Sequence, residues 1–89
     1  MNLIVLRTLV AIAEHGSFAE AARVLHLSQS AISTHIQALE AELGAALFDR
    51  SKRPPVLTDA GTATVAGAKD LLARYDIFRS GLSRAGDVQ

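Results

Sequence analysis

The spacing of glycine and proline constrains the fold of this 89-residue chain more than any other feature. Neither residue occurs in the stretches 1–15 and 17–43, which Gly16 separates. Because glycine and proline are the residues that most often interrupt a helix, both stretches are expected to be mainly helical. In the first stretch the apolar residues follow the three-and-four spacing of one helix face: Leu3, Leu6, Leu9, Val10 and Ala13. The sequence therefore predicts a first helix that ends near Gly16.

Residues 17–43 contain two signals for the start of a helix. Ser17 and Glu20 form a capping-box pattern, in which each side chain can accept a hydrogen bond from a free backbone N–H group. Ser28 is a second N-cap residue, and a new apolar period follows it. The stretch is thus predicted to fold as two helices joined by a short turn, with the second spanning residues 29–43. The apolar stripe of that second helix consists of Ile32, Ile36, Leu39 and Leu43.

The other face of the helix at 29–43 is polar but uncharged, since residues 24–39 contain no Lys, Arg, Asp or Glu. With the helix start, its hydrogen-bonding side chains are Ser28, Gln29, Ser30, Ser33, Thr34 and Gln37. A short helix, a tight turn and such a second helix form a helix-turn-helix arrangement, whose second helix lies in the DNA major groove. Gln pairs with adenine edges, and Ser and Thr bond to several bases or to phosphate. An ordinary solvated helix face has the same spacing, which leaves both interpretations open.

A basic segment follows this helix. Two short apolar runs, at 46–48 and 56–58, flank it and predict a two-stranded hairpin, or wing, with a long tip. The cationic residues of the segment 50–53 are Arg50, Lys52 and Arg53. Such side chains can contact DNA phosphates or enter a minor groove, whereas the alternative is a solvated loop that its charge keeps soluble. Acidic residues nearby in the sequence could weaken the positive charge: Glu40, Glu42 and Asp49.

The rest of the chain is predicted to form one long helix. Thr58 is a plausible N-cap, and the charge of Asp59 suits the first turn. A helix from residue 59 to about 84 would be roughly 40 Å long at ~1.5 Å per residue, so part of it should project from so small a core. It carries an apolar stripe of Ala68, Leu71, Leu72, Tyr75, Phe78 and Leu82. This stripe predicts a partner helix in a homodimer, or alternatively a contact with the first helix that completes the core.

Many spaced residues carry a family resemblance: Gly16-Ser17-Phe18, Ala21-Ala22, Leu25, Ser28 to Ser33, Ile36, Leu39-Glu40, Leu43-Gly44, Leu47-Phe48, Arg50 and Leu57 to Gly61. In this pattern the chain closely resembles the N-terminal DNA-binding domain of LysR-type transcriptional regulators, without gaps over about residues 1–65. The resemblance implies a mainly α, winged helix-turn-helix domain at 1–58, with a three-helix core and a two-stranded β wing. A long linker and dimerisation helix with a tail would follow at 59–89. The resemblance also implies that any inducer site belongs to a larger domain, which we expect to lie outside this chain.

The resemblance also implies which residues contact DNA. The base and phosphate contacts of the family fall on Gln29, Ser30, Ser33, Thr34 and Gln37 of the recognition helix and on Arg50 and Arg53 of the wing. The family commonly has proline at the position of Ser30 and often a basic residue at Thr34 or Gln37. Since this recognition helix lacks the usual cation, affinity is expected to be modest or unusually dependent on the wing.

The expected function is sequence-specific binding of a homodimer to double-stranded DNA, on a roughly palindromic operator, in transcription regulation. Nine basic and nine acidic residues give a formal net charge of zero. The alternative is therefore a winged-helix protein-interaction or oligomerisation module without DNA affinity. Substitution of Arg53 by Ala discriminates the two, since only the DNA-binding hypothesis predicts a shallower salt dependence.

Other classes of function are not favoured. The chain has no cysteine, and His15, His26 and His35 do not share a helix face, so we expect no metal and no cofactor. Ser33 and His35 point to different sides of one helix, which argues against an enzyme, and His35 is expected to be a packing residue. The apolar runs are far shorter than the roughly 18 residues of a membrane span. We also expect no secretory signal, and hence a cytoplasmic protein.

Overall fold

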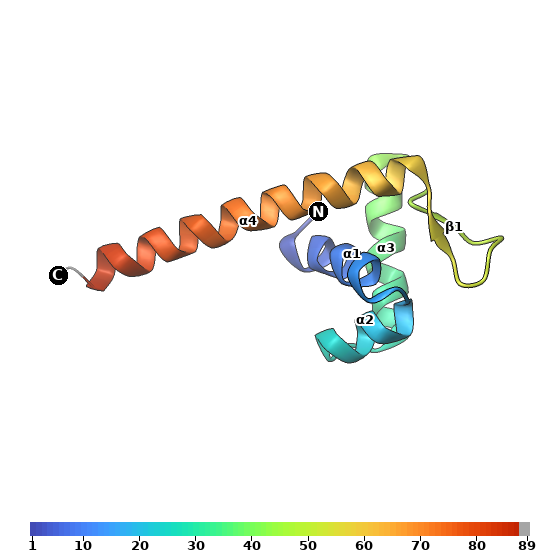
Figure 1. The fold of residues 1–89 in the computed structure, drawn as a ribbon, viewed down its shortest axis with the longest axis horizontal. Helices are drawn as coiled ribbons and strands as arrows, with labels where there is room; N and C mark the ends of the chain where they lie inside the picture. Colours follow the sequence, from blue (N-terminus) through green and yellow to red (C-terminus); the bar gives the residue numbers. More distant parts are fainter. Residues whose placement is uncertain (88–89) are drawn as a thin grey trace.

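The computed structural model describes the backbone of residues 1–87 and the side chains of residues 1–82. Figure 1 shows a bundle of short helices, a hairpin at one end and one long helix that leaves the bundle on the other side. The elements follow one another as α1 (Leu3–His15), α2 (Phe18–Leu25), α3 (Gln29–Leu43), β1 (Phe48–Asp49), β2 (Val56–Leu57) and α4 (Asp59–Asp87). This mainly helical, winged order is the one that the sequence predicts.

Local capping signals define the first three helices. Each of them begins after a residue whose side chain accepts a hydrogen bond from a backbone N–H group three residues on: Asn2 from Val5, Ser17 from Glu20 and Ser28 from Ala31. Each also ends at a residue with positive φ, namely Gly16, His26 and Gly44. The predicted division of residues 17–43 into two helices is confirmed.

The core lies where α1 packs against the other three helices. Leu9 of α1 and Ile32 and Ile36 of α3 are fully buried in it, and Leu39 is almost so. Burial of one such side chain contributes about 1.5–3 kcal/mol. The fourth residue of the predicted stripe, Leu43, is 43% exposed, because it follows the last position at which α3 faces the core.

The wing is a short antiparallel hairpin in which Phe48 pairs with Leu57 and Asp49 with Val56. Its strands are two residues long and so shorter than the predicted runs at 46–48 and 56–58. Beyond them, the backbone N–H of Thr58 donates to the carbonyl of Leu47 at 3.0 Å. These bonds hold the base of the wing closed, while residues 51–55 form its tip.

Thr58 joins the wing to α4. Its hydroxyl donates to the carbonyl of Ala46 at 2.6 Å and accepts from the N–H of Gly61 at 3.0 Å, so it caps the helix as predicted. Gly61 is buried against the same segment, and a Cβ atom there would overlap the carbonyl oxygen of Leu47. The start of α4 is therefore fixed directly to the base of the wing.

The first half of α4 completes the core, and its second half projects (Figure 1). Val65, Ala68 and Leu72 are buried in the core that α1 shares. Two ion pairs also join α4 to α1: Asp76 to Arg7 at 3.6 Å and Lys69 to Glu14 at 3.9 Å. Beyond them the helix continues to residue 87, and residues 88–89 of the predicted tail lie outside the described residues. Between residues 1 and 87, no helix has both the length and the apolar character needed to cross a membrane.

Candidate nucleic-acid interface

The outer face of α3 carries the predicted hydrogen-bonding side chains together. Ser33 is half-buried and the others are exposed: Ser28, Gln29, Ser30, Thr34 and Gln37. The Ser28 hydroxyl already accepts a hydrogen bond from the N–H of Ala31 and lies 3.4 Å from the Ser30 hydroxyl. Because α3 begins at Gln29, the N–H groups of its first turn have no carbonyl partner within the helix, and Ser28 caps one of them. The face offers donors and acceptors but no charge.

A partly buried side-chain contact joins α3 to α1. The hydroxyl of Thr8, in α1, donates to the carbonyl of Ile4 at 2.9 Å and lies 2.9 Å from Nδ1 of His35. Since a hydroxyl has one proton, both bonds hold together only if Nδ1 carries a proton and donates to Thr8. His35 is thus half-buried and contacts α1, on the side of α3 away from the polar candidates.

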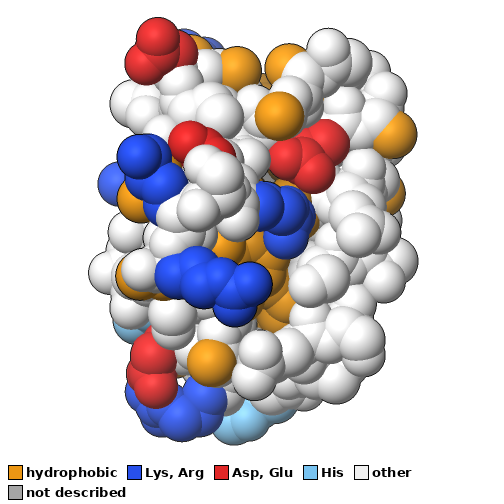
Figure 2. All heavy atoms as spheres, turned by 90° about the vertical axis from the view of Figure 1, so that its right-hand side faces the viewer, with side chains coloured by type: hydrophobic (Ala, Val, Ile, Leu, Met, Phe, Trp, Pro, Cys, Tyr) orange, Lys and Arg blue, Asp and Glu red, His pale blue; other side chains and the backbone are white. Residues whose placement is uncertain are grey.

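The cationic side chains of the wing occupy two different environments. Lys52 and Arg53 are exposed at the tip, and neither forms an ion pair with the described part of the chain. The sequence predicts Arg50 as part of this tip, but it lies at the base of the wing. Its guanidinium group is 3.9 Å from the carboxylate of Glu40 and 5.3 Å from the ring centroid of Phe18. Figure 2 shows Lys and Arg side chains gathered at the centre of the face on this side of the molecule.

The three acidic residues near the wing have separate roles. Glu40 faces Arg50, whereas Glu42 pairs with the N-terminal amino group at 3.0 Å. The carboxylate of Asp49 accepts hydrogen bonds from the hydroxyl and the backbone N–H of Ser51, which lower the pKa of Asp49. Only Glu40, of these three, forms an ion pair with a wing cation in the described part of the chain.

Helix α2 contains an ion pair between two of its own side chains, Arg23 and Glu20. Arg23 donates two hydrogen bonds to one carboxylate oxygen of Glu20, at 2.9 and 3.1 Å. This contact lowers the pKa of Glu20 and raises the pKa of Arg23. The one cation of α2 is therefore neutralised within its own helix.

Among the described residues, no cluster of three or more His, Asp or Glu side chains could hold a metal ion.

The predicted dimerisation stripe on α4 divides into two parts. Ala68 and Leu72 are buried in the core of their own chain, in line with the alternative that the stripe contacts the first helix. The side chains of Leu71, Phe78 and Leu82 are exposed, and Tyr75 is half-buried. Ile77, which is 69% exposed, was missed because it lies off the three-and-four spacing. The high hydropathy of Ile77 and Phe78 together would have indicated it.

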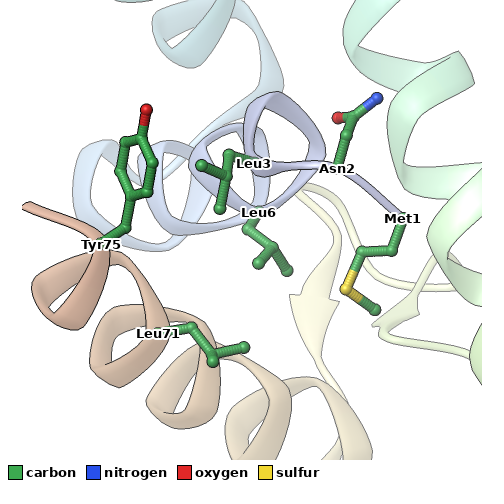
Figure 3. Close-up of a pocket in the computed structure, with 6 residues that line it drawn as sticks. All are labelled: Met1, Asn2, Leu3, Leu6, Leu71 and Tyr75. Atoms are coloured by element: carbon green, nitrogen blue, oxygen red, sulfur yellow. The ribbon is translucent and has the colours of Figure 1, made fainter. Parts of the chain in front are cut away.

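An open apolar groove of about 420 Å³ continues this exposed surface toward the start of α1. It is lined by Met1, Asn2, Leu3, Leu6, Leu71 and Tyr75. Figure 3 shows Leu71 and Tyr75 rising from α4 on one side and residues of α1 facing them. An apolar side chain from outside could enter between the two helices.

The sequence of the chain matches those of known regulators. The family model described as "Bacterial regulatory helix-turn-helix protein, lysR family" matches residues 3–62. The transcriptional regulator ClcR of Pseudomonas putida is 47% identical over 74 residues, which are 83% of this chain. The SDS degradation transcriptional activation protein of a Pseudomonas species is 47% identical over 83 residues, or 93% of this chain. The chain spans 25% and 27% of the length of these relatives.

Solved structures of similar chains include two complexes with DNA. The DNA-binding domain of BenM bound to its benA site 1 has a TM-score of 0.89 and 39% identity, over 96% of this chain and 99% of that one. The DNA-binding domain of CbnR in complex with DNA has a TM-score of 0.85 and 39% identity, over the full length of both chains. At this identity the likeness covers both the fold and the sequence of the winged unit and its long helix.

Proposed function

Because the chain belongs to the lysR family of bacterial regulatory helix-turn-helix proteins, we propose that it binds double-stranded DNA as the DNA-binding part of a transcriptional regulator. The observation that carries this proposal is the outer face of α3, where uncharged hydrogen-bonding side chains lie beside a cationic wing. In a chain with no net charge, this one side combines what base recognition and phosphate binding require.

In this proposal α3 and the wing make different contacts with DNA. In the proposed complex, α3 enters the major groove, where Gln29, Ser33 and Gln37 reach base edges. Ser28, Ser30 and Thr34 would bond to bases or phosphates near the helix start. The side chains of Arg50, Lys52 and Arg53 would neutralise phosphates or enter the adjacent minor groove. No catalytic role is proposed, and the site of action would be the nucleoid in the bacterial cytoplasm.

We also propose that the exposed half of α4 forms a homodimer. Phe78, Ile77 and Leu82 are between 58% and 69% exposed on a helix that projects from the core. A symmetric partner helix would cover them, and the groove of Figure 3 would accept side chains at the edge of that interface. Residues 1–58 would then act as the DNA-binding unit and 59–89 as the linker, so that two copies of α3 read a roughly palindromic operator.

Selection from a random-sequence duplex pool, followed by fluorescence anisotropy with nonspecific competitor, tests the DNA-binding proposal. We expect a site enriched at least about a thousandfold over competitor. Its affinity should fall steeply with salt, because phosphate contacts release counterions. No enrichment at low salt, from protein shown to be folded and dimeric, would instead support a protein-interaction module.

Analytical ultracentrifugation tests the dimer. Phe78→Asp places a charge in the centre of the exposed stripe and should yield monomers that keep their helical circular dichroism. Ser80→Asp is the matched control, since it adds the same charge at an exposed position two residues away, and it should remain dimeric. A dimer that persists in Phe78→Asp would remove the stripe as the interface.

A further inference from the structure

One carboxylate connects the end of α3 to the base of the wing. Glu40 lies in the last turns of α3, and its side chain is 19% exposed. One of its oxygens accepts the backbone N–H of Leu47 at 2.8 Å, in the segment that leads into β1. The other lies 3.9 Å from the guanidinium group of Arg50. The same side chain therefore holds the backbone that enters the wing and the first cation that follows β1.

An aromatic ring from α2 completes the setting of Arg50. The guanidinium carbon lies 5.3 Å from the ring centroid of Phe18, within the range of a cation–π contact. That ring is held in turn by an edge-to-face contact with Phe48 of β1, with centroids 5.1 Å apart at 64°. Arg50 is thus placed between α3 and α2, and its side chain remains 45% exposed.

These contacts leave part of the guanidinium group available. It carries five N–H donors, and the contact with Glu40 involves one of its terminal nitrogens. The contact with the ring of Phe18 uses no conventional hydrogen bond, so it takes up none of these donors. The outward donors of Arg50 can therefore bond to a phosphate oxygen while both internal contacts persist. Lys52 and Arg53 have no comparable restraint in the described part of the chain.

We infer that Glu40 is a positioning residue for DNA binding, which orders Arg50 for contact with a phosphate before DNA arrives. The inference rests on the proposed function. A long side chain that is already ordered loses less conformational entropy on binding, which is the advantage of a held cation over a free one. A partly exposed ion pair of this length contributes little to folding. Loss of the Glu40 charge, with the hydrogen bond from Leu47 kept, should therefore affect DNA affinity more than stability.

The sign of the effect separates this role from simple electrostatics. Glu40 is negative, so if it acted only through its charge, its removal would strengthen the binding of DNA. If it acts through Arg50, its removal weakens binding. Glu42 provides the matched control, because it is also on α3, two residues away, and faces the N-terminal amino group instead of the wing.

The first test compares Glu40→Gln with Glu42→Gln on a fluorescent random-sequence duplex at low salt. The amide oxygen of the introduced glutamine side chain can still accept the N–H of Leu47, so melting temperatures should stay close to that of the wild type. We expect Glu40→Gln to bind about two- to tenfold more weakly, the cost of ordering one long side chain. Glu42→Gln, with the same change of charge, should bind at least as tightly as the wild type.

A double-mutant cycle shows whether the effect passes through Arg50. In an Arg50→Ala background, Glu40→Gln should cause no further loss of affinity. Arg50→Ala alone should reduce the salt slope by about 0.9, the value of one phosphate contact. Glu40→Gln alone should leave the slope near that of the wild type, because Arg50 still reaches the phosphate. The inference is overturned if Glu40→Gln binds as tightly as the wild type, or if its loss persists undiminished in the Arg50→Ala background.

Phe18→Leu gives a second route to the same result if the Glu40 variant folds poorly. Leucine keeps an apolar contact with Phe48 and removes the ring beneath Arg50, so affinity should fall only when Arg50 is present. Failure of the wild type to bind the duplex pool at low salt would count against the proposed function itself. Normal binding by the wild type, with the loss expected for Arg50→Ala but none for Glu40→Gln or Phe18→Leu, would refute only the role of Glu40.

Discussion

The outer face of α3 and the wing lie side by side but differ in chemistry and in support. The six polar candidates on α3 include no charged side chain. On the other side of the helix, Ile32 and Ile36 are buried in the core and His35 contacts Thr8 of α1. The wing carries Arg50, Lys52 and Arg53 on a hairpin whose strands are two residues long. In a chain with zero net charge, hydrogen bonding and positive charge are thus allotted to separate elements. The contributions of sequence reading and phosphate binding can therefore be separated by substitution.

The largest effect should come from Gly61→Ala, which disturbs the support that both regions share. A Cβ atom at this position would overlap the carbonyl oxygen of Leu47, at the base of the wing, and backbone cannot give way as a flexible side chain does. We expect the free energy of unfolding to fall by about 1–3 kcal/mol, as for overpacked sites in general. Urea denaturation followed by circular dichroism measures it.

Gly67→Ala is the matched control for this substitution. Gly67 lies in the same helix, and a Cβ atom added there would meet nothing within 4 Å, so alanine should stabilise the protein by up to about 1 kcal/mol. Equal stability of the two alanine variants would mean that the contact between Gly61 and the wing base is not restrictive.

Gln29→Ala should show the contribution of α3 alone, because it should change base discrimination without changing the salt dependence. If Gln29 pairs with a base through two hydrogen bonds, its loss should reduce discrimination at one operator position by about 1–3 kcal/mol. The salt slope should not change, because no charge is removed. Anisotropy titrations with the selected site and its single-base variants measure both quantities. Unchanged discrimination at every position would remove Gln29 from the set of base contacts.

Arg53→Ala should show the contribution of the wing alone, because it should change the salt dependence without changing the sequence preference. We expect a salt slope shallower by about 0.9 and weaker binding to all duplexes alike, with the preference among sequences preserved. Arg74→Ala serves as the control, since it removes an exposed cation that pairs with Asp70 on the projecting α4, at 3.7 Å. A change of preference in Arg53→Ala, without a change of slope, would assign the wing to base reading instead.

The sequence predicts most of the fold because its signals are local. The N-cap side chains of Ser17 and Ser28 and the glycines at 16 and 44 lie within a few residues of the backbone groups they affect. The six polar candidates on α3 follow from helix periodicity in the same way. The environment of the apolar stripe on α4 was harder to predict, because the same helical spacing includes both Ala68, which is in the core, and Phe78, which is in solvent. Periodicity does not say where along a helix the core ends.

The setting of Arg50 could not be predicted from the sequence for a related reason. Its partners are Glu40, ten residues earlier, and Phe18, thirty-two residues earlier, and no repeat or motif connects the three. They meet only because α2, α3 and β1 pack together. Composition places Arg50 with Lys52 and Arg53 as one basic cluster, whereas the structure places it apart from them at the base of the wing.

The smallest effect should appear at the wing in acid. Asp49 accepts two hydrogen bonds from Ser51, which lower its pKa in the folded protein below that of the unfolded chain. Its contribution to stability is therefore present above the unfolded pKa and is lost as the pH falls through the lower, folded value. The polar face of α3 has no titratable group among its six candidates, so this change should be confined to the wing.

NMR titration of the Asp49 carboxyl carbon should give a pKa below the ordinary range of aspartate. In Ser51→Ala, which keeps the backbone N–H but loses the hydroxyl, that pKa should rise part of the way back. Identical titration curves for the two proteins would mean that the hydroxyl of Ser51 does not hold the wing turn in solution.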